Sequence, residues 1–215
     1  MKKEFKNQLE LQTKITKEDV SVCHGISKAA IIIPSLSYVI KIPFNGSFIR
    51  NYEYDDETED YDFDNYEDVF EEYLNADDID GCTDWDYCNN EYRKYLIAKE
   101  NGFTEFFAET RLLSNERHPI YLQEKVIAYE YHSNDRVLTE EDREYIGSYK
   151  TSSGNYACGP YKWSLDIIEK YGVERANALF DFLVDNNMDR DLHCGNVGYR
   201  ENGDPVIIDW AGWRD

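Results

Sequence analysis

Three polar residues near the end of the chain have the types and the spacing that a phosphate-handling site requires. Asp191 precedes Asn196 by five positions, and Asn196 precedes Asp209 by thirteen. Carboxylate and amide oxygens are ligands that Mg²⁺ accepts, and a further carboxylate can take the proton of a hydroxyl group. We therefore expect these residues to hold Mg²⁺ with phosphate oxygens beside an activated hydroxyl.

The segment between Asn196 and Asp209 predicts a hairpin that would bring the two residues together. Residues 197–199 and 206–208 form two short strands, and the turn between them contains Asn-Gly, the strongest short-range hairpin signal. A hairpin returns its second strand to the level at which the first strand began. We therefore expect Asn196 and Asp209 to face one another at the open end, with Asp191 in the preceding loop.

The run Arg190-Asp191-Leu192, with Asn196 and then Asp209, resembles the catalytic core of the protein kinase-like superfamily. The resemblance implies that Asp191 is the catalytic base. It also implies that Asn196 and Asp209 hold Mg²⁺ on the phosphates of ATP.

Some residues depart from the pattern of protein kinases. Asp189 replaces the usual His before the base, His193 stands where protein kinases often have Lys, and Trp210 follows the metal-binding Asp. In these features the chain is similar to aminoglycoside phosphotransferases and related small-molecule kinases.

The resemblance also implies an early strand lysine and a helical acid. Residues 31–33 and 38–42 predict two strands around a turn, and Lys41 lies in the second, in a context similar to the kinase strand whose Lys contacts the phosphates. Residues 90–100 predict a helix with Gly102 as its C-cap. Glu91 is then expected to pair with Lys41, with Glu100 as the reserve.

Two further parts of a nucleotide site are expected from backbone groups. Strands over 106–113 and 120–128 would lead into a hinge near Glu124 and Val126, whose backbone would meet the adenine. The amides of Gly25 and Ser27 would cap the phosphates, although no G-x-G-x-x-G motif is present.

The order of these elements predicts the fold class. Residues 165–171 and 176–184 predict helices, the second with an apolar face of Ala176, Leu179, Phe180 and Leu183. We expect an α+β, bilobal, protein kinase-like fold. Its N-lobe, 1–125, would hold an antiparallel sheet and one helix. Its C-lobe, 126–215, would be a reduced helical lobe without the usual C-terminal helices, because the sequence stops six residues after Asp209.

Composition excludes some classes of partner. The net charge of −21 and the pI of about 4.5 argue against direct binding to nucleic acid or to anionic membranes. No stretch is apolar and long enough to predict a transmembrane helix. The five cysteines are odd in number and lack C-x-x-C spacing, which indicates reduced thiols in a cytoplasmic protein.

The acidity belongs to one segment. Residues 51–90 contain 17 Asp or Glu and no Lys or Arg, which leaves −4 for the other 175 residues. Six tyrosines lie in the same segment, whereas disordered tracts are usually poor in aromatic residues. It is interpreted as an insertion between the Lys41 strand and the Glu91 helix: a solvated loop, a docking site for a basic protein partner, or a mimic of nucleic-acid phosphates. A second loop, 147–160, is expected to be a mobile connection.

These patterns lead to one expected function and two alternatives. The leading hypothesis is an ATP- and Mg²⁺-dependent phosphotransferase, a minimal protein serine/threonine kinase that modifies a protein acceptor. The first alternative is an inactive kinase-like interaction protein whose acidic segment binds or blocks a basic or nucleic-acid-binding partner. The second is a small-molecule kinase.

Overall fold

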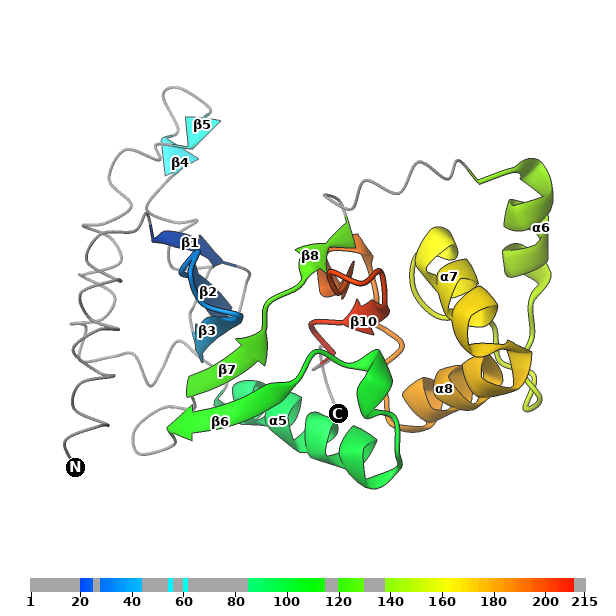
Figure 1. Ribbon diagram of the computed structural model, residues 1–215, viewed down its shortest axis with the longest axis horizontal. Helices are drawn as coiled ribbons and strands as arrows, with labels where there is room; N and C mark the ends of the chain where they lie inside the picture. Colours follow the sequence, from blue (N-terminus) through cyan, green and yellow to red (C-terminus); the bar gives the residue numbers. More distant parts are fainter. Residues whose placement is uncertain are drawn as a thin grey trace. The chain divides into compact units, whose positions relative to one another are not determined.

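The protein is an α+β chain of helices and antiparallel sheets (Figure 1). The computed structural model describes residues 20–24, 28–43, 54–55, 60–61, 85–114, 120–129 and 138–210. Across these described ranges, no helix combines the length and the apolar character needed to cross a membrane.

The helices are α5 (Trp85–Glu100), α6 (Glu140–Ser148), α7 (Tyr161–Tyr171) and α8 (Val173–Asp185), with 3₁₀ turns η1 (Thr104–Phe106) and η3 (Cys194–Asn196). The strands are β1 (Ser21–His24), β2 (Lys28–Ile32), β3 (Tyr38–Pro43), β4 (Tyr54–Asp55), β5 (Asp60–Tyr61), β6 (Thr110–Ser114), β7 (Ile120–Glu124), β8 (Ile127–Ala128), β9 (Val197–Tyr199) and β10 (Pro205–Ile207).

The chain divides into two compact units, 1–88 with 112–122, and 89–111 with 123–215. Residues 89–111 therefore group with the C-terminal unit, whereas the predicted N-lobe extends to residue 125. Their grouping follows from burial, because Phe103 and Phe106 belong to the same apolar cluster as α7 and α8.

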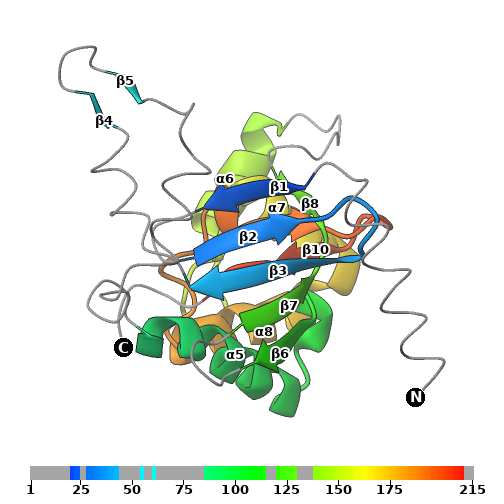
Figure 2. The ribbon, with the colours of Figure 1, turned by 90° about the vertical axis from the view of Figure 1, so that its left-hand side faces the viewer.

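A five-stranded sheet in the order β1-β2-β3-β7-β6 contains the predicted early hairpin (Figure 2). β2 and β3 are antiparallel, as expected, and Lys41 lies opposite Ala30. Lys41 is half-buried on this sheet. The small side chain of its cross-strand partner leaves room beside a long lysine stem.

The acidic segment is described in part. β4 and β5 pair antiparallel within it, with Tyr54 opposite Tyr61. The helix α5 begins at Trp85, so the last six residues of the predicted insertion, 85–90, are helical. Residues 68–75, whose sequence could form a short helix, lie outside the described residues.

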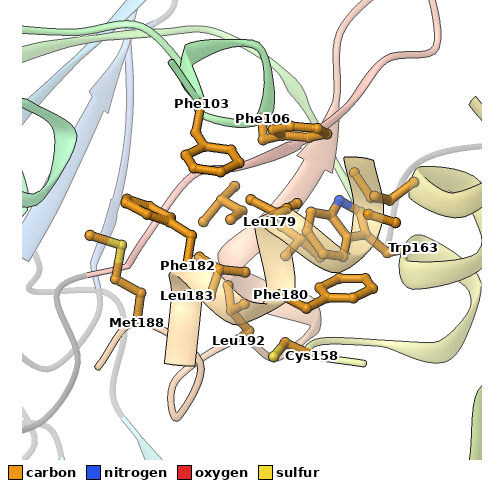
Figure 3. Packing of buried hydrophobic residues seen from close by; sticks show 14 of the residues in the cluster. Phe103, Phe106, Cys158, Trp163, Leu179, Phe180, Phe182, Leu183, Met188 and Leu192 are labelled. Carbon is orange, nitrogen blue, oxygen red and sulfur yellow. The ribbon is translucent and has the colours of Figure 1, made fainter. Parts of the chain in front are cut away.

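The C-terminal unit has a core rich in aromatic side chains (Figure 3). Trp163, Phe180 and Leu183 have no exposed surface, and they come from α7 and α8. The predicted apolar face of α8 is confirmed, because Ala176 and Leu179 are also fully buried. At 25 cal/mol per Å², burying each large side chain contributes about 2 kcal/mol, which fixes α7 and α8 against each other.

The helix α5 ends as predicted but buries a different face. Gly102 has a φ of +74° and its amide donates to the Lys99 carbonyl, a left-handed cap that glycine adopts without strain. The sequence predicts this helix from the spacing of Tyr92, Tyr95, Leu96 and Lys99, and of these Leu96 is 37% exposed. The buried stripe instead carries Glu91, Lys94, Tyr95 and Ala98, which have helical spacing but include two charged residues.

The end of α8 leads directly into the loop that carries Asp191. The amide of Met188 donates to the Leu183 carbonyl at 2.8 Å, and that of Asn187 donates to the Val184 carbonyl at 3.1 Å. Asn187 has a φ of +52°, which completes a Schellman cap. Asn is the side chain that best tolerates this conformation after glycine, so the cap explains why the helix stops here.

The predicted hairpin is present, and its turn lies within the predicted residues 201–204. β9 and β10 are antiparallel, with Val206 opposite Gly198. The amide of Arg200 donates to the Asp204 carbonyl, and the amide of Gly203 donates to the Arg200 carbonyl. In this turn only Gly203 has a positive φ, so this is a three-residue loop with a glycine bulge.

Gly198 on β9 is required by a close approach of β8. A Cβ built on Gly198 would lie 2.5 Å from the Ile127 carbonyl oxygen, which is backbone and cannot swing away. Gly198→Ala is expected to push β8 away from β9. It should lower the free energy of unfolding by about 2 kcal/mol, measured by urea denaturation.

A matched control is Gly147→Ala on α6, where the nearest atom to a new Cβ is 3.9 Å away. This change is expected to be neutral or to stabilise by up to about 1 kcal/mol, because alanine suits a helix better than glycine. Equal effects of the two substitutions would show that the contact with β8 is not what requires glycine.

The segment 147–160, for which the sequence predicts a mobile connection, begins in the last two residues of α6 and is hydrogen-bonded to α8. Asp181 on α8 accepts hydrogen bonds from Thr151, Ser152, Ser153 and Asn155. Burial opposes the charged form of Asp181, but these four donors hold the pKa of its carboxyl below the ordinary value. One carboxylate thus closes the loop, which serine and glycine content alone would predict to be flexible.

Candidate functional site

The hairpin β9–β10 places Asn196 beside Asp209. The carbonyl oxygen of Asn196 accepts hydrogen bonds from the amides of Ile208, at 2.9 Å, and Asp209, at 3.2 Å. These bonds extend the strand pairing by one step beyond the register Val197–Ile207. Two residues that are thirteen positions apart are therefore neighbours at the open end of the hairpin.

The side chain of Asn196 has a defined orientation. Its Nδ2 donates to the carbonyl oxygen of Asp191 at 2.6 Å, and the residue is 8% exposed. Because the carbonyl can only accept, the nitrogen must face it, and the Oδ1 atom faces the other way. The amide oxygen is thus directed away from the Asp191 backbone and is available in type to a hard cation.

Asp191 lies in a loop closed by backbone bonds. The amide of His193 donates to the Asp191 carbonyl at 3.1 Å, and the amide of Asn196 donates to the His193 carbonyl at 2.9 Å. Leu192, between them, is 8% exposed and packs in the core. The loop therefore has a buried anchor on one side and a carboxylate, 13% exposed, beside it.

His193 lies beside Asp191, and a hydrogen bond indicates which of its ring nitrogens carries the proton. Its Nδ1 accepts the amide proton of Gly195 at 3.1 Å, so this nitrogen carries no proton and Nε2 carries one. Nε2 lies 3.8 Å from Asp191 Oδ1. The distance is too long for a direct hydrogen bond.

The residue after Asp209 is fixed to α5. Trp210 is fully buried, and its Nε1 donates to the Glu91 carbonyl at 2.9 Å. The Trp210 ring also packs edge-on to Phe107, with centroids 5.2 Å apart. The indole thus fixes where the chain leaves the hairpin, immediately beside Asp209.

The carboxylate of Glu91 is buried. It has no exposed surface, and its Oε1 accepts from Gln123 Nε2 at 3.1 Å. The same amide donates to Thr110 Oγ1 at 3.2 Å. A buried carboxylate needs hydrogen bonds or a cation to offset its desolvation, and Gln123 supplies part of that requirement.

Glu124, expected at the hinge through its backbone, has a structural side chain. Arg200 donates from Nε to Oε1 at 2.8 Å and from Nη2 to Oε2 at 3.0 Å. Arg200 also donates to the carbonyls of Glu105 and Phe107. Although burial disfavours the charged guanidinium, the pKa of Arg200 is raised by Glu124. The amide of Glu124 donates to the Glu109 carbonyl, at 2.8 Å.

The remaining predicted site residues are Lys41, Val126, Gly25 and Ser27. Lys41 is in β3. Val126 lies in the connection between β7 and β8 and is half-buried. Gly25 and Ser27 lie outside the described residues. Their predicted roles remain predictions.

Sequence reasoning missed Lys94, Asp181 and Arg200. Each makes contacts whose partners are distant in sequence, such as the 93 positions that separate Lys94 from Asn187. Lys94 could have been found from its helical spacing to Glu91. No cluster of three or more His, Cys, Asp or Glu side chains that could hold a metal by itself is present among the residues that the structure describes.

Comparison with known proteins gives one distant likeness. No family model matches the chain, and no curated protein matches it. Among solved structures, the chain is similar to the streptomycin–ATP–APH(2")-IIa ternary complex at 12% identity and a TM-score of 0.32. The match covers 96% of this chain and 70% of that chain. A likeness this distant assigns neither a family nor a function.

Proposed function

We propose that the protein is an ATP- and Mg²⁺-dependent phosphotransferase. The observation that carries the proposal is the hairpin end, where the Asn196 carbonyl binds the amide of Asp209 while the Asn196 side chain binds the Asp191 carbonyl. Asn196 thus makes hydrogen bonds to both Asp191 and Asp209, the two other residues expected at the site. Neighbouring oxygen ligands and a carboxylate are the minimum that phosphoryl transfer requires of a protein.

Asn196 and Asp209 would hold the Mg²⁺. The donor set is one amide oxygen and one carboxylate, both hard oxygen ligands, and Mg²⁺ commonly takes only one or two protein ligands together with phosphate oxygens and water. The ion would neutralise charge on the transferring phosphate.

Asp191 would accept the proton of the acceptor hydroxyl. As the hydroxyl oxygen bonds to the γ-phosphorus, the bond from that phosphorus to the bridging oxygen breaks and ADP leaves. His193 Nε2 lies 3.8 Å from this carboxylate. Lys41, paired with Glu91, would contact the phosphates, with the amides of Gly25 and Ser27 above them and the backbone near Glu124 and Val126 against the adenine.

The amide of Glu124 already donates to Glu109, so the hinge contact is better assigned to Val126.

We infer a protein serine or threonine as the acceptor, with a small-molecule hydroxyl as the alternative. A non-catalytic protein whose segment 51–90 binds a basic partner is the rival class. Residues 51–90 carry a charge of −17. A basic protein is therefore the expected acceptor of the kinase, and also the expected partner of the non-catalytic protein.

Thermal shift with Mg-ATP tests the nucleotide site. At a free concentration of about 100 times the Kd, a ligand that binds only the folded protein adds about 2.7 kcal/mol. The expected rise in Tm is about 5 °C or more for a chain of this size. Asp209→Asn is expected to remove most of the rise, because a neutral amide binds Mg²⁺ more weakly than a carboxylate does.

ATP with EDTA is the control, since it leaves the nucleotide but removes the metal. No rise in Tm at millimolar Mg-ATP would contradict the proposal and favour the interaction protein. A rise that persists in full in Asp209→Asn would place the metal ligands elsewhere.

A further inference from the structure

The helix α5 buries a lysine against the segment that leads into the Asp191 loop. Lys94 is 5% exposed, and its Nζ donates to the carbonyl oxygen of Asn187 at 3.2 Å. Burying an ammonium group carries a desolvation cost that a methionine of similar length would avoid. Packing alone therefore does not account for a lysine at this position, and one group that its ammonium binds is the Asn187 carbonyl.

The position of the Asn187 carbonyl affects how the loop that carries Asp191 begins. The Schellman cap uses the carbonyls of Leu183 and Val184, and not that of Asn187. The left-handed φ of +52° at Asn187 turns the chain out of α8. Met188 follows, fully buried, and the loop begins at Asp189. A contact that fixes the Asn187 peptide thus fixes the direction in which the loop starts.

The same turn of α5 holds the other end of the site. Glu91, three residues before Lys94, accepts at its carbonyl from Trp210 Nε1. Residues three apart lie on one face of a helix. One helical turn therefore contacts the chain both before Asp191 and immediately after Asp209.

We propose that Lys94 is a positioning residue, which sets where Asp191 lies relative to Asn196 and Asp209 by holding the Asn187 carbonyl. In this role it acts through the loop and not by contact with nucleotide or acceptor. Its effect on phosphoryl transfer rests on the proposed function, whereas its effect on the loop does not. The two can therefore be measured separately.

The test compares Lys94→Met with Lys99→Met, which removes an exposed lysine from the same helix. Hydrogen exchange of peptides from 188–197 is expected to be about tenfold faster in Lys94→Met, the effect of losing a hydrogen bond to a charged group. Peptides from α8 are expected to be unchanged. In transfer assays, kcat is expected to fall about tenfold with the KM for ATP within about threefold of the wild type.

Lys94→Arg retains a cationic donor and is expected to recover most of the protection and of kcat. Should Lys94→Met fail to fold, Lys94→Gln serves in its place, because its shorter side chain is polar and carries no charge. Equal exchange in the Lys94 and Lys99 variants would overturn the assignment, as would loss of protection in α8 to the same degree. If the wild type transfers no phosphate, the proposed function fails, while the exchange data still decide the role of Lys94.

Discussion

Replacing Asp191 by asparagine is expected to lower the rate of phosphoryl transfer from ATP about a thousandfold. Asparagine keeps the size of the side chain but cannot take a proton from a hydroxyl group. The bond from Asn196 Nδ2 goes to the backbone carbonyl of residue 191, so the substitution leaves it in place. The loss is therefore expected in kcat, with the Kd for Mg-ATP little changed.

The measurement is transfer of labelled γ-phosphate from ATP to the chain itself or to a basic protein. Asp189→Asn is the matched control, since it removes the same charge from the same loop and its carbonyl contact with the Leu192 amide is backbone. Its activity is expected to stay within about threefold of the wild type. An active Asp191→Asn variant would rule out this residue as the base. Loss of Mg-ATP binding in that variant would instead assign Asp191 to the metal.

Arg200→Leu is expected to lower the free energy of unfolding by about 3 kcal/mol. The guanidinium makes two hydrogen bonds to Glu124 and two to the carbonyls of Glu105 and Phe107. The Arg200 and Glu124 side chains are only 21% and 27% exposed, so water replaces these bonds poorly. Leucine would leave a partly buried carboxylate without its partner, which costs more than the bond itself contributes.

Urea denaturation followed by tryptophan fluorescence measures this effect, because Trp163 and Trp210 are fully buried in the core of the same unit. Arg111→Leu is the control. Its ion pair with Glu109 joins side chains that are 59% and 43% exposed, and it is expected to cost less than about 1 kcal/mol.

A double variant that replaces Arg200 and Glu124 by leucine separates the two contributions. It is expected to be less destabilised than the sum of the single variants, because neither charge is then left alone. Additive effects would show that Arg200 acts mainly through the Glu105 and Phe107 carbonyls. A loss below about 1 kcal/mol in Arg200→Leu would contradict a structural role for the pair.

Local rules predicted the parts of the site that lie close together in sequence. The β9–β10 hairpin follows from two short apolar runs around a turn, and its register places Asn196 beside Asp209. The left-handed cap at Gly102 and the apolar face of α8 were likewise readable, because both depend on residues within two helical turns. The turn lies at the predicted residues, with a positive φ at Gly203.

The burial of charged side chains could not be predicted from local sequence rules. The helical spacing read in α5 includes the apolar Leu96, which is exposed, whereas the buried stripe carries Glu91 and Lys94. A charged side chain is stable inside only where partners meet it, and Gln123 and Asn187 come from other elements. The loop 147–160 shows the same limit, since its order depends on Asp181 of α8.

The sequence by itself therefore determined which side chains could do chemistry at the hairpin: two carboxylates and an amide at spacings that a short antiparallel pairing brings together. Only the tertiary structure decided what holds them there. Lys94 and Arg200 bind carbonyls and a carboxylate more than 70 positions away in the chain. Hairpin pairing is a property of neighbouring residues, whereas the free energy of a buried charge depends on whatever the complete fold places around it.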